Sequence, residues 1–219
     1  MGNKPFVDNG MQWLVLVYVL AFGILMLLTN HGDFVLWLND KHTSFGDFFF
    51  KYWTHLGDGV LLAIVALYFL FTNLYRFYYM LIAIALQTVF VHIFKQWLFD
   101  GEPRPKTFFA DQVDSLNFVE GVTTRGFDSF PSGHTASAFT LAFVLISLCK
   151  NKALNVCLFV AAVLVGISRV YILQHFLRDI YIGSVFGVLA ALIAWYIIKP
   201  YADRPKLQSG LSFRPPQKS

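Results

Sequence analysis

The stretch SRVYILQHFLRD, residues 168–179, separates two long apolar runs and holds four ionisable side chains. These are Arg169, His175, Arg178 and Asp179. Ionisable groups are costly in a membrane, and they usually face the protein interior or a watery cavity where they have a function. The stretch therefore predicts two membrane helices joined by a segment that contributes to a functional site.

The composition places the chain among integral membrane proteins. Its 219 residues are 57% hydrophobic and 14% charged, whereas an ordinary soluble domain has roughly 25% charged residues. A helical span needs roughly 20 apolar residues, and runs of that kind recur along almost the whole chain. The first run, residues 11–28, is too long for the core of a signal peptide and is predicted to be a membrane helix.

The expected fold is all-α, an integral membrane bundle of six transmembrane helices in one domain over residues 1–200. The predicted spans are residues 11–28, 60–72, 77–99, 134–148, 153–173 and 180–198. The aromatic segment FGDFFFKYWTHLGDG, residues 45–59, predicts an interfacial helix with an aromatic belt. The polar segment 100–130 predicts a structured extracytoplasmic loop. Residues 201–219, rich in Pro, Ser, Lys and Arg, predict a disordered, basic cytoplasmic tail.

The distribution of basic residues predicts the orientation in the membrane. With six spans, both termini lie on the side that holds Lys4, Arg76, Lys150, Lys152, Lys199, Arg204, Lys206, Arg214 and Lys218, with Asp8 and Asp203 as its acids. Because cytoplasmic loops are enriched in Lys and Arg, we expect cytoplasmic termini and a site on the periplasmic or extracellular side. A single compact domain without a cleavable signal favours a bacterial inner membrane, with a eukaryotic endomembrane as the alternative.

Three polar stretches fall on that outer side, and we expect them to meet there. They are KQWLFDGEPRP at residues 95–105, PSGH at residues 131–134 and the stretch quoted above. Lys95, Arg104 and Arg169 are the kind of fixed cations that clamp a phosphate, the arginines through bidentate forks. In PSGH, Ser132 can cap the following helix and Gly133 lets the backbone approach a ligand, so that free N–H groups face an anion. The combination predicts a phosphate site.

Two histidines and a carboxylate add the groups that phosphoryl transfer needs. His175 and Asp179 lie four residues apart, so in a helical turn the carboxylate would hold one ring N–H and free the other nitrogen to attack. His134 would then supply a proton to the leaving oxygen. This assignment is a hypothesis based on residue types and spacing.

These motifs resemble those of the type 2 phosphatidic acid phosphatase superfamily. PSGH is similar to the second signature motif of that family, and the third is similar to the pattern Ser-Arg, five residues, His, three residues, Asp in residues 168–179. The first motif differs, because eight residues separate Lys95 from Arg104, whereas the family usually has six. Either the turn FDGE bulges to accommodate the extra residues, or Lys106 takes the place of Lys95.

The resemblance implies metal-independent hydrolysis of a phosphoester, with no cofactor. It implies a phosphohistidine on His175, support from Asp179 and general acid catalysis by His134. The phosphate would be held by Lys95, Arg104, Ser132, Gly133 and Arg169. Embedding in the membrane favours a lipid phosphate or lipid pyrophosphate at the outer leaflet. Undecaprenyl pyrophosphate, phosphatidylglycerophosphate, phosphatidic acid and lipid A phosphates all fit.

Two other functions share some of these features. A lipid phosphotransferase would carry the same motifs but pass the phosphate to a hydroxyl acceptor instead of water. A lipid transporter would use buried charges to line a pathway, although the motifs are predicted to gather at one face and not at the midplane. No nucleic-acid partner is expected, and the sequence leaves the oligomeric state open.

Several other ionisable residues are interpreted as structural. His31, His42 and His55 are expected to be interfacial hydrogen-bonding groups. Arg178 is expected to pair with an acid of the loop or with a lipid headgroup. Glu102 lies beside the predicted phosphate clamp and would repel a phosphate, so it either points away or contacts an amine or hydroxyl of the substrate.

Overall fold

The computed structural model describes residues 5–211, and the all-α prediction is confirmed, because no strand occurs in that range. The α-helices are α1 (Asn9–Leu28), α2 (Asp33–Asn39), α3 (Ser44–Trp53), α4 (Gly59–Thr72), α5 (Leu74–Ile93), α6 (Pro105–Phe108), α7 (Gly133–Leu148), α8 (Lys152–Tyr171) and α9 (Leu177–Ile198). A π turn follows α5 at Phe94–Leu98, and 3-10 turns lie at Thr54–Gly57, Ala110–Ser115, Lys199–Tyr201 and Pro205–Leu207.

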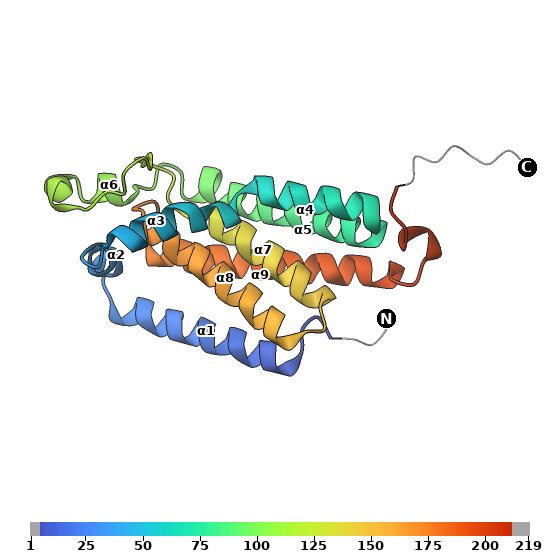
Figure 1. Cartoon of the computed structure of the whole chain (residues 1–219). Coiled ribbons are helices and arrows are strands. Elements are labelled where there is room, and N and C mark those ends of the chain that lie inside the picture. Colours follow the sequence, from blue (N-terminus) through green and yellow to red (C-terminus); the bar gives the residue numbers. More distant parts are fainter. Residues whose placement is uncertain (1–4, 212–219) are drawn as a thin grey trace, which may run out of the picture.

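The long helices run along an elongated bundle in which α7 is central. Helices α2 and α6 and the loop around α6 lie at one end, and the described ends of the chain lie at the other (Figure 1). Most residues of α7 are buried, and α7 contacts α4, α5, α8 and α9. In contrast, α1 buries only Met11 and Tyr18 against the protein. The PSGH motif therefore lies at the start of the most enclosed helix.

Two glycines let α9 lie unusually close to α7. A Cβ at Gly183 would lie 2.6 Å from the carbonyl oxygen of Ser132, and one at Gly187 would lie 2.5 Å from that of Ala136. Small residues four apart allow membrane helices to approach in this way. The approach joins the starts of both helices, because the Ser132 backbone N–H donates to the Asp179 carbonyl oxygen at 3.0 Å.

Helix length and hydropathy account for four or five of the six predicted spans. In the described residues, four helices are long and apolar enough to cross a membrane, and a fifth span results if α3 and α4 are counted as one bent span. Helix α7 has 16 residues, or about 24 Å, which is shorter than the hydrocarbon core of about 30 Å. Because neighbouring helices surround α7, it does not need the length of a lipid-facing span. The count of six stays a prediction.

The predicted interfacial helix is α3, and it is joined to α4 with a bend of 48°. Phe45 and Phe48 are exposed, as an aromatic belt requires. On the other face, the indole N–H of Trp53 donates to the Ala161 carbonyl oxygen in α8 at 3.2 Å. The helix is therefore also a packing element of the bundle.

The 100–130 loop has the predicted order, whereas residues 201–211 are more ordered than predicted. The 100–130 loop is structured, with α6 and a 3-10 turn inside it. Residues 201–211, predicted to be disordered, contain 3-10 turns and pack on the α4–α5 connection, where the Leu211 N–H donates to the Leu70 carbonyl oxygen at 2.9 Å. The rest of that predicted tail, residues 212–219, lies outside the described residues, as do Lys4, Arg214 and Lys218 of the charge pattern.

Candidate active site

A pocket of ≈ 400 Å³ opens at the end of the bundle that carries the 100–130 loop. Six of the eight predicted site residues line it: Lys95, Arg104, Gly133, His134, Arg169 and His175. The other two, Ser132 and Asp179, are fully buried and hold their neighbours in place. Lys51 and Arg125 also line the pocket, which brings the cations to five, and no Asp or Glu is among the described residues that line it.

His175 is buried and paired with Asp179. Its Nδ1 lies 3.3 Å from Asp179 Oδ2, and the same oxygen accepts hydrogen bonds from Ser129 Oγ at 2.5 Å and from the Phe176 N–H at 2.9 Å. The predicted pairing is present, but the two residues do not lie in one helical turn. His175 precedes the helix, and Asp179 reaches back from the first turn of α9 to the chain before it, as a capping carboxylate does.

A sharp turn places His175 at the pocket. Leu173 adopts a left-handed backbone conformation with φ of 57°, which is uncommon for a bulky residue and costs energy. Its side chain is 1% exposed and packs in the core beneath the loop, so burial can offset the strain. The His175 N–H then donates to the Arg169 carbonyl oxygen at 3.1 Å.

The start of α7 matches the predicted cap. Ser132 is the N-cap residue, and its Oγ accepts hydrogen bonds from the backbone N–H and the hydroxyl of Thr135, the latter at 2.9 Å. Gly133 follows at the pocket wall. The unpaired N–H groups at the start of a helix and its positive dipole end favour an anion.

Arg169 is the cation of the clamp that has a buried donor without a partner in the described residues. Its side chain is 8% exposed, and Nη1 donates to the Thr54 hydroxyl at 2.8 Å. Its Nε is buried and has no hydrogen-bond partner among the described residues. Buried donors without a partner are rare in folded proteins, so this guanidinium suits an anionic ligand.

Arg104 differs from the predicted bidentate fork, because most of its donors bind the protein. Nε donates to the Phe127 carbonyl oxygen at 2.7 Å, Nη2 to that of Asp128 at 3.1 Å, and Nη1 to the carbonyl and side-chain oxygens of Gln174. A guanidinium has five N–H donors, so these four bonds leave one. Arg104 therefore ties the loop to the turn before His175 and presents one N–H.

Lys95, and not Lys106, lies at the pocket. The Lys95 ammonium donates to the Asp128 carbonyl oxygen at 2.7 Å, the same atom that accepts from Arg104. Lys106 is exposed and does not line the pocket. The turn between Lys95 and Arg104 bulges, as one of the two alternatives required, with Gly101 at a φ of 71°.

Glu102 does not line the pocket that holds the five cations. Of the two positions that the sequence left open, the structure therefore has Glu102 pointing away from the phosphate clamp. Glu102 Oε2 pairs with Arg178 Nη2 at 2.5 Å, and the Arg178 guanidinium lies over the Phe130 ring. Arg178 thus pairs with a loop acid, as expected.

Asp58 is a site residue that sequence reasoning missed. Its Oδ1 lies 2.8 Å from His134 Nε2, and its Oδ2 lies 2.7 Å from His55 Nδ1. No group of three or more His, Cys, Asp or Glu side chains within residues 5–211 could hold a metal ion. The Asp58 carboxylate bridges the two histidines. Its place just before the second apolar run, on the side of the three motifs, was the available signal.

The cations around His175 affect its protonation. Burial, followed by the positive charges of Arg104, Arg169 and Lys95, lowers the pKa of His175 well below 6.5. A lowered pKa keeps the imidazole neutral, which is the form that can attack. Burial also lowers the pKa of Arg104.

Comparisons with known proteins identify the family of the chain. A family model, described as the PAP2 superfamily, matches residues 76–202, more than half of the chain. Lipid phosphate phosphatase 1 of Arabidopsis thaliana is 28% identical over an alignment that covers 92% of this chain and 72% of that protein. Phosphatidylglycerophosphatase B of Bacillus subtilis (strain 168) is 28% identical, with 78% of each chain covered. The crystal structure of Aquifex aeolicus LpxE matches with a TM-score of 0.65 at 28% identity, covering 76% of this chain and 94% of that one. The chain therefore belongs to the PAP2 superfamily, and it is a membrane phosphatase.

Proposed function

We propose that the chain hydrolyses a lipid phosphate or lipid pyrophosphate through a covalent intermediate on His175. The observation that carries this proposal is the His175–Asp179 pair at a pocket lined by five cations. Because Asp179 holds Nδ1, the other ring nitrogen, Nε2, is left as the nucleophile.

In the first step, His175 Nε2 attacks phosphorus, and the bond between phosphorus and the lipid-side oxygen breaks. His134 gives its proton to that leaving oxygen. In the second step, water attacks the phosphohistidine, His134 takes a proton from this water, and the P–N bond breaks. The products are inorganic phosphate and the lipid alcohol, or, from a lipid pyrophosphate, inorganic phosphate and the lipid monophosphate. Both histidines return to their starting states.

The remaining residues hold charge and orientation. Arg169 and the first N–H groups of α7 face the phosphate oxygens, where charge redistributes in the transition state. Lys95 and the free N–H of Arg104 complete the clamp, with Ser132 and Gly133 shaping the helix start. Asp58 orients His134 and stabilises its protonated form once a phosphate dianion offsets the surrounding cations.

Lipid pyrophosphate is the candidate substrate that Lys51 and Arg125 favour. Both line the pocket in addition to the three predicted cations. A pyrophosphate ester carries more negative charge than a phosphate monoester, and a second phosphate needs further donors. A phosphatidylglycerophosphate-like monoester is the alternative. Transfer to a hydroxyl acceptor instead of water would use the same residues.

We further propose that residues 1–200 form the membrane domain in a bacterial inner membrane, with both termini in the cytoplasm. The Lys and Arg residues on the side that holds both termini support this orientation. The pocket then faces the periplasm or the extracellular side. A lipid substrate presents its headgroup there, and its tails pass laterally between the helices into the bilayer.

The test is phosphate release by purified full-length protein in detergent with EDTA, across a panel of lipid phosphates and lipid pyrophosphates. We expect activity in the wild type, and losses of at least about 100-fold in His175→Ala and His134→Ala. His92→Ala is the matched control, because His92 is exposed and does not line the pocket.

The panel also separates the alternatives. Faster release from pyrophosphates that slows in Lys51→Gln and Arg125→Gln supports that substrate class. A His175→Ala variant with wild-type release would refute the phosphohistidine. A protein that releases no free phosphate, but phosphorylates a hydroxyl acceptor when one is added, is a phosphotransferase.

A further inference from the structure

A second cavity, of ≈ 320 Å³, lies at the opposite end of the bundle, beside the described chain ends. Helix α7 connects the two ends, with His134 at the catalytic pocket and Ser147 at this cavity. Ser147 follows His134 by thirteen positions, which corresponds to about 20 Å along the helix. The mechanism proposed above uses no residue of this cavity.

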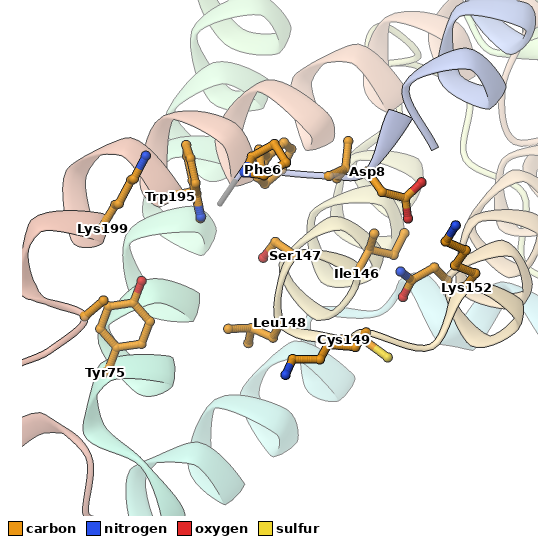
Figure 2. Close-up of a pocket in the computed structure, with 15 residues that line it drawn as sticks. Phe6, Asp8, Tyr75, Ile146, Ser147, Leu148, Cys149, Lys152, Trp195 and Lys199 are labelled. Carbon is orange, nitrogen blue, oxygen red and sulfur yellow. The ribbon is translucent and has the colours of Figure 1, made fainter. Parts of the chain in front are cut away.

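Aromatic and apolar side chains form one part of the cavity wall. Figure 2 shows Tyr75, Trp195 and Lys199 on one side, Asp8 and Lys152 on the other, and Ser147 from α7 between them. Phe6 packs on Trp195 with ring centroids 5.8 Å apart. Aromatic side chains that combine with cations at a helix end are typical of the membrane–water interface.

The charged side chains of the cavity are mainly basic. Lys150, Lys152 and Lys199 line it, and Asp8 is the acid among its described lining residues. Asp8 accepts a hydrogen bond from the Met11 N–H at 3.0 Å and caps α1. The three lysines therefore leave the cavity with a net positive charge that suits an anion.

A buried amide points to the other half of the ligand. Asn155 lines the cavity and is 4% exposed, and its Oδ1 has no hydrogen-bond partner among the described residues. A buried carbonyl oxygen without a donor is costly. A ligand that brings a hydroxyl would remove that cost.

We propose that this cavity binds the headgroup of an anionic phospholipid that carries a hydroxyl group. The positive charges of Lys150, Lys152 and Lys199 attract the phosphate, the hydroxyl donates to Asn155 Oδ1, and the apolar part of the lipid lies against Phe6 and Trp195. The aromatic wall at the membrane interface favours a lipid over a soluble phosphate ester. The proposal concerns a site separate from the phosphatase pocket and does not depend on its substrate.

The test is lipid binding to delipidated full-length protein, measured by native mass spectrometry and by thermal melting. Phosphatidylglycerol has the anionic phosphate and the hydroxyls, phosphatidylmethanol lacks the hydroxyl, and phosphatidylcholine lacks the net charge. We expect one tightly retained phosphatidylglycerol, with weaker binding of the other two. Each measurement is repeated with orthovanadate in the phosphatase pocket, and we expect binding to persist.

Variants locate the site. Lys152→Gln and Lys199→Gln are expected to weaken phosphatidylglycerol binding about fivefold each, while Lys206→Gln, an exposed lysine at the same end but outside the cavity, leaves it unchanged. Asn155→Leu is expected to abolish the preference for phosphatidylglycerol over phosphatidylmethanol.

The proposal would be overturned by equal binding of phosphatidylcholine, by loss of binding with orthovanadate, or by wild-type affinity in both lysine variants. Soluble glycerophosphoglycerol that binds as tightly as the lipid would also overturn it, because the cavity would then be a site for soluble phosphate esters.

Discussion

Replacing Asp58 with asparagine tests whether the pair between Asp58 and His134 supports proton transfer. Asp58→Asn keeps the size of the side chain and removes its charge, so the 2.8 Å contact with His134 Nε2 becomes at best a neutral hydrogen bond. Hydrogen bonds to charged groups contribute about 1.5–3 kcal/mol. The two side chains are 35% and 34% exposed, and solvent screening at such exposure favours the lower end, about 1.5–2 kcal/mol. This corresponds to a loss of about 10- to 30-fold in kcat.

The assay compares two leaving groups. An alkyl lipid phosphate needs a proton on its leaving oxygen, whereas p-nitrophenolate leaves without one. If Asp58 acts through His134 as the general acid, Asp58→Asn slows phosphate release from the lipid and has little effect on p-nitrophenyl phosphate.

Asp47→Asn is the matched control, because Asp47 pairs with His42 at 3.0 Å and neither residue lines the pocket. We expect that variant to keep its activity. His55→Gln separates the other partner of Asp58, and we expect a small effect because His55 is 64% exposed. Equal losses on both substrates in Asp58→Asn would show that Asp58 supports folding or binding instead, and no loss on either would refute the role.

Three further predictions concern His175, Asp179 and the packing of α9 on α7. The acid limb of kcat/KM is expected below pH 6.5, because the lowered pKa of His175 keeps its imidazole neutral to a lower pH than usual. In Arg104→Gln the loss of a positive charge raises the pKa of His175, so the limb of the remaining activity moves to higher pH; a limb that stays in place or moves lower contradicts this. Ser129→Ala removes the 2.5 Å donor to Asp179 and is expected to lower kcat about tenfold or more, whereas Ser115→Ala, an exposed site, should have no effect on kcat. Gly187→Ala is expected to lower thermal stability by about 1–3 kcal/mol, because its Cβ would meet the Ala136 carbonyl oxygen, while Gly59→Ala, with no atom within 4 Å, should have no such effect.

The features that could be predicted from the sequence depend on residues that are close together in the chain. The hydrophobic runs place the helices within a few residues of their bounds, and the cap in PSGH is the Ser132 cap of α7. The motifs also meet in one pocket, because helices that alternate in direction bring the end of α5, the start of α7 and the α8–α9 turn to the same end of the bundle. These results follow from hydropathy, helix capping and the alternating direction of successive helices, which the sequence indicates without tertiary contacts.

The residues that were missed depend on contacts between distant segments. Asp58 and Thr54 lie on either side of the bend between α3 and α4, and neither belongs to a motif. They reach His134 and Arg169 because the turn at this 48° bend packs against α7 and α8. The interpretation of residues 45–59 as an interfacial helix alone could not include this bend, since an isolated amphipathic segment has no information on its packing partners.

The spacing of the first motif shows how local backbone geometry can compensate for sequence length. The chain leaves α5 through a π turn at Phe94–Leu98, in which i to i+5 hydrogen bonding accommodates an extra residue in the helix. The next turn passes through Gly101 at positive φ, a conformation that glycine adopts without a steric penalty. The π turn contains Lys95, and Gly101 lies between Lys95 and Arg104. Both cations still reach the Asp128 carbonyl oxygen. Eight intervening residues thus bring Lys95 and Arg104 to the same pocket.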